Sequence, residues 1–118
     1  MEPILSRAKD REVVSTAHGG EVLKEVIYAQ ESGFLPEGQI TQIAVGRFPA
    51  GYTEDNTHAH RTMWQLDFVI EGEMTCVVEG VEYHLGPRDF LAIPPGMAHR
   101  QLTGKMPVIT FYFGIAVS

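Results

Sequence analysis

The chain has 118 residues, the length of one ordinary domain, and 44% of them are hydrophobic while 20% are charged. This balance is typical of a folded globular protein and argues against intrinsic disorder. Nine Lys and Arg residues against fifteen Asp and Glu give a net charge of −6 without any basic run, so the sequence excludes the surface of a nucleic-acid-binding protein.

The N-terminal residues 1–20 are predicted to form an arm. Apolar residues between Pro3 and Val14 are too sparse for one face of a helix, so no helix is predicted there. Residues 1–10 carry charges where a signal peptide would have an apolar run, and no stretch is long enough to cross a bilayer. The single cysteine, Cys76, cannot form an internal disulfide. We therefore expect a cytoplasmic protein with no membrane partner.

Short runs rich in β-branched and aromatic residues follow, and many of the 12 glycines and 7 prolines stand between them. This alternation of short strands and turns is typical of an all-β sandwich or barrel. Strands are predicted over residues 22–29, 39–48, 65–70, 74–78, 81–85, 90–93 and 108–115. We expect a single domain over residues 1–118, with its barrel core over residues 39–116.

Two consecutive hairpins are expected within the barrel. Glu71-Gly72 and Glu79-Gly80 each stand between two predicted strands, and glycine supplies the positive φ that tight turns require. The last predicted strand, residues 108–115, is apolar on both faces. That pattern is typical of a central strand or of one buried in a subunit interface.

The triplet His58-Ala59-His60 is the first pattern that indicates chemistry. In an extended strand, residues i and i+2 face the same side, so two imidazoles can reach one metal ion. Two histidines at this spacing are by themselves more often part of a polar strand face. Here Gln65 and Gly72 follow at set intervals, and Pro-Pro-Gly-Met-Ala-His comes at residues 94–99, after two further hairpins.

Together these segments resemble the cupin superfamily, whose first motif contains H-x-H, a glutamate and a glycine, and whose second motif ends in P-x-G-x-x-H. The spacings from His60 to Gln65 and from Gln65 to Gly72 agree with the first motif, and residues 94–99 agree with the second. The departures are a glutamine at position 65, shifted glycines at 51 and 86, and a threonine at 103. The resemblance covers residues 51–103 and implies an all-β cupin fold, a double-stranded β-helix or jelly-roll-like barrel.

Carried over to this sequence, the resemblance implies that His58, His60, Gln65 and His99 bind one divalent transition metal ion. Three imidazoles and an amide oxygen suit zinc, nickel, manganese, iron or copper, and the residue types do not choose among them. Because all four side chains are neutral, the ion would keep its full double charge and act as a strong Lewis acid.

Two further residues are predicted to take part in catalysis. If Gln65 faces the barrel interior, alternation turns Asp67 inward, where it can orient a ligand or act as a base. The alternative is that Asp67 twists toward solvent or pairs with Arg47. Arg100, like Arg61 and Arg88, flanks a ligand segment and could clamp a substrate carboxylate, although a charge on the solvent-facing rim is the other interpretation.

Three functions remain open, because the cupin fold hosts enzymes, sensors and storage proteins. The first is a metal-dependent enzyme that ketonises or isomerises a small carbohydrate-like substrate, such as a uronate or a keto-sugar. The second is a non-catalytic small-molecule-binding module, which resembles the effector domain of arabinose-regulator-type proteins. The third is a metal-free deoxysugar ketoisomerase. The resemblance also implies a homodimer, since small cupins commonly pair through the outer sheet and the N-terminal arm.

Overall fold

The structure is a computed structural model, which describes residues 2–15, 23–27, 38–54 and 57–117. Its strands are β1 (Ile4–Ser6), β2 (Val13–Ser15), β3 (Leu23–Glu25), β4 (Gln39–Phe48), β5 (Met63–Glu71), β6 (Met74–Val78), β7 (Val81–Leu85), β8 (Phe90–Ile93), β9 (His99–Thr103) and β10 (Val108–Ala116). One turn of 3₁₀ helix, η1 (Ala8–Asp10), stands between β1 and β2. No α-helix occurs within the described ranges.

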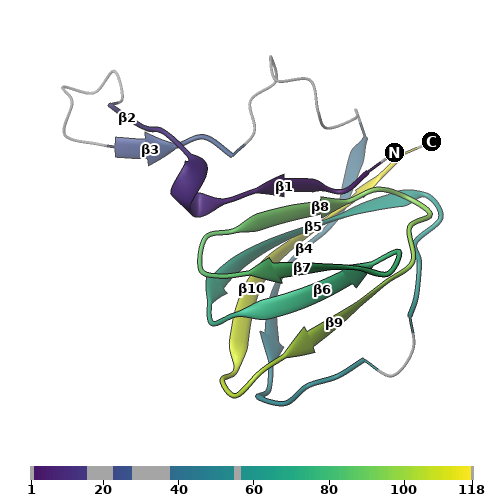
Figure 1. Ribbon diagram of the computed structural model, residues 1–118. Helices are drawn as coiled ribbons and strands as arrows, with labels where there is room; N and C mark the ends of the chain where they lie inside the picture. Colours follow the sequence, from purple (N-terminus) through teal and green to yellow (C-terminus); the bar gives the residue numbers. More distant parts are fainter. Residues whose placement is uncertain (1, 16–22, 28–37, 55–56, 118) are drawn as a thin grey trace.

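The strands form two facing sheets and a two-stranded arm (Figure 1). The larger sheet has the order β1-β8-β5-β10-β4, the smaller sheet has the order β7-β6-β9, and β2 pairs with β3 in the arm. Every one of these pairings is antiparallel. The predicted all-β fold is confirmed, and the strand over residues 108–115 is the central strand that its two apolar faces indicate, because β10 lies between β5 and β4.

The predicted strands over residues 39–48, 74–78, 81–85 and 90–93 have the observed bounds. The strands β5 and β10 are slightly longer than the predicted strands over residues 65–70 and 108–115. The strand predicted over residues 22–29 corresponds to the shorter β3, and residues 22, 28 and 29 lie outside the described ranges. Sequence reasoning missed β1, β2 and β9. In particular, β1 pairs with β8, so this part of the predicted arm belongs to the larger sheet.

Both predicted hairpin turns are present. At Glu79-Gly80 the two residues have φ of 47° and 79°, which matches the twist of the flanking strands β6 and β7. At Gly72 φ is 89°, and a Cβ atom there would lie 2.5 Å from the Pro107 carbonyl oxygen. Glycine is therefore required at position 72 by both its backbone conformation and the close approach of a neighbouring loop.

Apolar side chains lie on both faces of the larger sheet. Between the two sheets is a buried cluster of Val69, Met74, Cys76, Val78, Leu85, Leu91, Ile93 and Val108. On the outer face of the larger sheet a second cluster contains Trp64, Leu66, Phe90 and Ala92, against which Ile4 and Ile27 from the N-terminal segments pack. The strand β5 therefore alternates between an outer apolar row and an inner row of Gln65, Asp67 and Val69.

Asp89 fastens the N-terminal segment to the turn before β8. Its carboxylate accepts hydrogen bonds from the backbone N–H groups of Ala8 and Gly86 at 2.9 and 2.8 Å, and it pairs with the Arg7 guanidinium at 3.1 Å. Burial by itself raises the pKa of Asp89, but the Ala8 and Gly86 hydrogen bonds and Arg7 outweigh it, so the pKa lies below its ordinary value.

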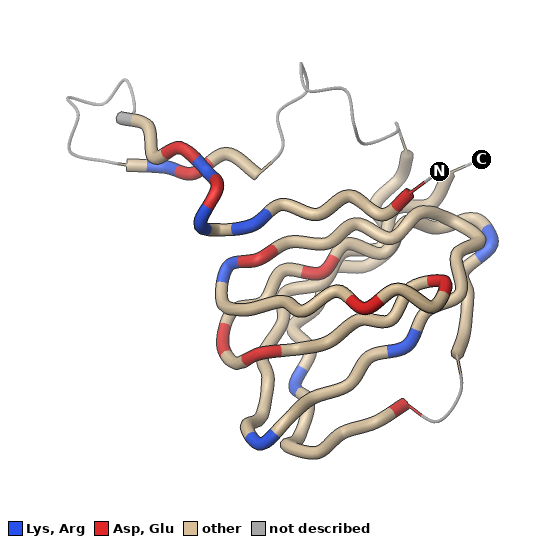
Figure 2. The backbone as a smooth tube through the Cα atoms, in the orientation of Figure 1, with Lys and Arg blue, Asp and Glu red and all other residues tan. Residues whose placement is uncertain are grey.

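Charged residues of both signs are interspersed over the described backbone (Figure 2). In the arm, Glu25 pairs with Arg11 at 3.6 Å and with Arg88. Among the described residues, no helix has the length and apolar character that crossing a membrane would need.

Asp89→Asn is expected to lower the free energy of unfolding by about 1–3 kcal/mol at pH 7, because charged acceptors make the stronger hydrogen bonds. The folded-state pKa of Asp89 is lowered, so its contribution is fully present above the unfolded value of 3.8 and is lost as the pH falls through the folded value. Urea unfolding at pH 7 and at about pH 3 measures this difference. The exposed Asp10→Asn is the matched control, and an equal effect of both substitutions would contradict the prediction.

The homodimer stays a prediction, and the structure indicates where to test it. Within the described residues β4 is an edge strand, and its side chains Ile40, Ile43 and Val45 are 55, 57 and 52% exposed. Sedimentation at micromolar concentration should show a dimer that Ile43→Lys weakens. Val81→Lys, at an equally exposed position on β7, is the control and should leave the dimer intact. A monomeric unsubstituted protein would show the prediction to be wrong.

Candidate metal centre

Backbone pairing brings the two histidine-containing segments together. His58 and His99 form an antiparallel bridge, in which the His58 N–H donates to the His99 carbonyl at 2.9 Å and the His99 N–H donates to the His58 carbonyl at 2.7 Å. The Gly96 N–H donates to the His60 carbonyl at 2.7 Å. The H-x-H segment is thereby fastened to the turn before β9, although the two are far apart in sequence.

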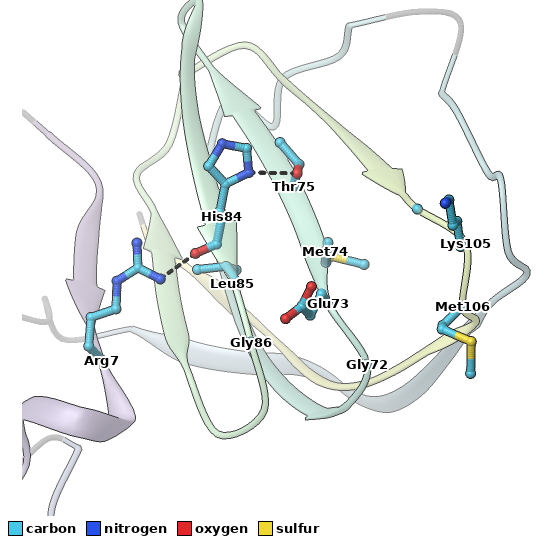
Figure 3. Close-up of a pocket in the computed structure, with 11 residues that line it drawn as sticks. Arg7, Gly72, Glu73, Met74, Thr75, His84, Leu85, Gly86, Lys105 and Met106 are labelled. Atoms are coloured by element: carbon cyan, nitrogen blue, oxygen red, sulfur yellow. Dashed lines mark hydrogen bonds between the residues drawn. The ribbon is translucent and has the colours of Figure 1, made fainter.

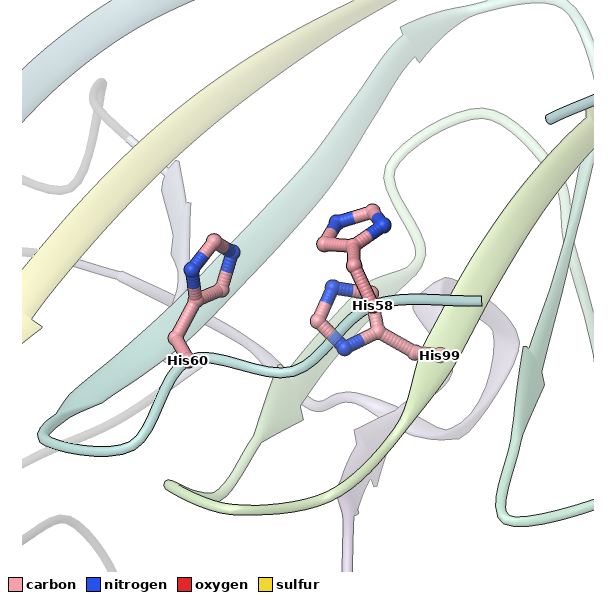
Figure 4. A group of neighbouring side chains, drawn as sticks. All are labelled: His58, His60 and His99. Atoms are coloured by element: carbon pink, nitrogen blue, oxygen red, sulfur yellow. The ribbon is translucent and has the colours of Figure 1, made fainter. Parts of the chain in front are cut away.

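The three imidazoles of His58, His60 and His99 converge on one another (Figure 4). Their ring centroids are 4.4 to 5.4 Å apart, and each ring offers a nitrogen within 4.8 Å of the nitrogens of the other two. Gln65 reaches the same place from β5, with its Oε1 atom 3.2 Å from His60 Nε2 and 3.1 Å from His99 Nε2. The four residues named from the sequence are therefore neighbours, while their role as metal ligands stays a prediction.

His99 is oriented by a backbone acceptor. Its Nδ1 donates to the Met97 carbonyl at 3.0 Å, and a neutral imidazole has only one N–H, so Nε2 presents a lone pair to Gln65 Oε1. Burial lowers the pKa of His99, the Met97 hydrogen bond opposes this, and the charges of His58 and His60 lower the pKa further. A neutral ring is the form that binds a metal.

The donor set fits a divalent transition metal. His99 Nε2 and Gln65 Oε1 are both acceptors and stand only 3.1 Å apart, an arrangement that a cation between them would satisfy. Three imidazole nitrogens with one oxygen are a common ligand set for zinc and its neighbours in the transition series. This cluster can therefore hold a metal ion.

Asp67 lies behind Gln65 and faces inward, as the alternation of β5 predicts. Its Oδ2 atom accepts hydrogen bonds from Gln65 Nε2 at 2.9 Å and from Gln101 Nε2 at 3.2 Å. Burial raises the pKa of Asp67 to about 6, the Gln65 hydrogen bond opposes this, and the charge of Glu54 adds to it. Neither alternative from the sequence, a side chain in solvent or an ion pair with Arg47, describes this buried carboxyl group.

Glu54 is a second carboxylate beside the imidazoles. Its Oε2 atom lies 3.3 Å from His58 Nδ1, yet this oxygen is buried and makes no hydrogen bond. Burial of a carboxylate oxygen without a hydrogen bond is costly, and such an oxygen can accept a hydrogen bond from a hydroxyl group of a ligand.

A cavity of about 310 Å³ opens beside these groups. Its lining consists of Ala44, Gly46, Phe48, Glu54, His58, Gln65, Asp67, Gln101, Thr110 and Tyr112. The carboxylates of Glu54 and Asp67 both belong to this lining, and no Lys or Arg is among the described lining residues. Burial and the charge of Asp67 raise the pKa of Tyr112, so its phenol is a hydrogen-bond donor at neutral pH.

Sequence reasoning missed four polar residues of the cavity: Glu54, Gln101, Thr110 and Tyr112. Gln101 follows His99 by two residues, so alternation along a strand could have found it had β9 been recognised. Thr110 and Tyr112 lie on the inner face of β10 by the same rule. Glu54 stands outside the named strands, and no periodic signal indicates it.

The arginines predicted to clamp a substrate do not line the cavity. Arg100 alternates with the buried His99 and Gln101 along β9, so its side chain projects from the opposite face of the strand. Arg61 is exposed, and Arg88 pairs with Glu25 in the arm. The catalytic role predicted for Arg100 therefore has no support in its position.

A larger cavity of about 680 Å³ lies at the other end of β6 (Figure 3). Met74 lines it and pairs with Thr103, whereas Val78 at the far end of the strand pairs with His99. The only imidazole among its described lining residues is that of His84, whose Nδ1 contacts the Thr75 hydroxyl at 2.9 Å. The larger cavity is therefore separate from the three clustered imidazoles.

Known structures share this architecture. A predicted oxalate decarboxylase from Thermotoga maritima superposes with a TM-score of 0.62 at 17% identity, over 94% of this chain and 97% of that one. The 3′-monoepimerase ChmJ from Streptomyces bikiniensis, in complex with dTDP-quinovose, has a TM-score of 0.70 at 12% identity, over 95% and 63%. A cupin protein from Bacteroides fragilis has a TM-score of 0.59 at 17% identity, over 63% and 64%. The chain thus spans less than two thirds of the last two proteins.

No curated protein matches the chain in sequence. The family described as Cupin domain matches residues 44–110, which include the whole of the imidazole cluster and more than half of the chain. The match and the shared architecture agree with the resemblance that the two histidine motifs indicate, and the chain belongs to the cupin family.

Proposed function

We propose that this cupin binds one divalent transition metal ion through His58, His60, Gln65 and His99, and that it isomerises or ketonises a small carbohydrate-like carbonyl compound. The observation that supports this most is the convergence of three imidazoles and an amide oxygen beside a cavity that Glu54 and Asp67 line. A bound ion would polarise a carbonyl oxygen of the substrate as a Lewis acid.

Residues that line the cavity would carry out proton transfer and hold the substrate. Isomerisation next to a carbonyl group requires removal of a proton from carbon, and the buried Oε2 atom of Glu54, which belongs to the cavity lining and makes no hydrogen bond, can accept that proton. Asp67 Oδ2 already accepts two amide hydrogens. We therefore assign proton abstraction to Glu54, and hydrogen bonding to substrate hydroxyl groups to Tyr112 and Gln101.

Within this class the cavity favours an uncharged keto-sugar over a uronate. A uronate carries a carboxylate, and the described lining offers no Lys or Arg to pair with it, while Glu54 and Asp67 would repel it. A volume of about 310 Å³ lies at the small end of the usual range for ligand sites, so one sugar unit is the expected size.

His99→Ala is expected to reduce the bound transition metal from about one ion per chain to less than a tenth of that, since the buried ring is one of the proposed ligands. Elemental analysis after dialysis measures the metal content. His84→Ala removes an exposed histidine outside the cluster and should leave the content unchanged. A wild-type protein without stoichiometric metal would refute the proposed metal site and favour the metal-free ketoisomerase.

Glu54→Gln is expected to lower kcat for a keto-sugar by roughly 100-fold or more, the usual contribution of a positioned base, without loss of bound metal. Turnover of a panel of keto-sugars and unsaturated uronates can be followed by ultraviolet absorbance and by proton NMR. Faster turnover of the uronates would contradict the preference argued from the lining. Saturable binding without any turnover would establish the non-catalytic binding module instead.

A further inference from the structure

Gln65 can act as a metal ligand in only one of the two orientations of its amide. Its oxygen faces His60 and His99, while its nitrogen donates to Asp67 Oδ2 at 2.9 Å. Rotation of the amide by half a turn would place the NH₂ group toward the imidazole nitrogens. An amide NH₂ group is a donor without a lone pair for a metal ion, so the reversed side chain could not bind one.

The buried position and the hydrogen bonds of Asp67 favour the observed orientation of the Gln65 amide. The residue is 2% exposed, and its Oδ2 atom accepts from Gln65 on β5 and from Gln101 on β9. Because Asp67 Oδ2 accepts from both amide NH₂ groups, it pairs with the nitrogen end of the Gln65 amide, whereas the oxygen end would bring two acceptors into contact. Gln101 holds this carboxylate from the opposite sheet.

We propose that Asp67 is a positioning residue for the metal site, which keeps the oxygen of Gln65 directed at the imidazoles. The inference rests on the metal binding proposed above. It also gives a physical reason for glutamine at a position where cupins usually carry glutamate. A glutamate there would place a second carboxyl oxygen about 2.9 Å from Asp67 Oδ2, where glutamine supplies an N–H donor.

The test compares affinities for Co²⁺ by calorimetry and by the visible absorption of the bound ion. Asp67→Leu removes the acceptor, so the Gln65 amide can reverse, and affinity should fall about 10- to 100-fold, as is usual for the loss of a residue that orients a metal ligand. Asp67→Asn keeps one oxygen that can accept from Gln65 and Gln101. Its Co²⁺ affinity should therefore stay within about threefold of that of the unsubstituted protein. Unchanged affinity in Asp67→Leu overturns the proposal.

Repeating the substitution in a Gln65→Glu variant separates an effect of Asp67 on the orientation of the Gln65 amide from an effect of Asp67 on the fold or through its charge. In Gln65→Glu the ligand has two equivalent oxygens and needs no orientation, and Asp67→Leu also removes the carboxyl group that crowds it, so adding Asp67→Leu to this variant should leave Co²⁺ affinity unchanged or raise it. The same loss in both backgrounds would show that Asp67 acts through the fold or through its charge. Asp67→Ser, which is too short to reach Gln65, replaces Asp67→Leu should the latter not fold.

The orientation is also measurable without metal. In ¹⁵N-edited NMR of the metal-free protein, the side-chain NH₂ protons of Gln65 should exchange slowly with water, and Asp67→Leu but not Asp67→Asn should speed their exchange. The exposed Gln42 provides the reference for free exchange. If the Gln65 NH₂ protons exchange slowly but the protein binds no Co²⁺, the proposed function is refuted while the hydrogen bond from Gln65 to Asp67 is confirmed. Exchange as fast as that of Gln42 would overturn the role of Asp67.

Discussion

The hydrogen bond between Gln65 and Asp67 joins two buried polar side chains in the barrel interior, next to the apolar cluster between the sheets. Buried polar groups are tolerated when they are paired, and each of these two residues has its partners within the interior. Gln65 meets the imidazoles at one end and Asp67 at the other, and Gln101 closes the set from the facing sheet. Backbone pairing of His58 with His99 brings the imidazoles together, and these side-chain contacts hold Gln65 beside them.

The interior is divided along the strands into an apolar and a polar region. On β5 the inner row changes from Gln65 and Asp67 to Val69, which belongs to the apolar cluster between the sheets. On β9 the inner residues are His99 and Gln101, opposite Val78 and Cys76 of β6. The apolar region supplies the burial that stabilises the fold, while the polar region keeps a cavity open. The same pair of sheets therefore holds both the apolar core and the candidate metal centre.

Strand prediction succeeded where apolar alternation and a turn signal occur together. The strands over residues 74–78 and 81–85 were predictable because alternating apolar residues flank a turn with glycine, and both signals are local. His99–Thr103 was missed because His-Arg-Gln-Leu-Thr has no apolar alternation, since its inner residues belong to the polar site. A segment that contributes to a binding site is often the one that departs from the pattern of a core strand.

From its residues alone, the sequence determined the all-β class and the two hairpins, and it placed Asp67 on the same strand face as Gln65; the resemblance to cupins implied the candidate ligands. The fold class, the hairpins and the shared strand face follow from periodicity and turn chemistry over a few residues. Only the tertiary structure decided that Glu54 lies beside His58, that Gln101 shares the carboxylate of Asp67, and that Arg100 projects away from the cavity. The reason is physical: such contacts depend on how strands far apart in the chain pair and in which register, and no local pattern carries that information.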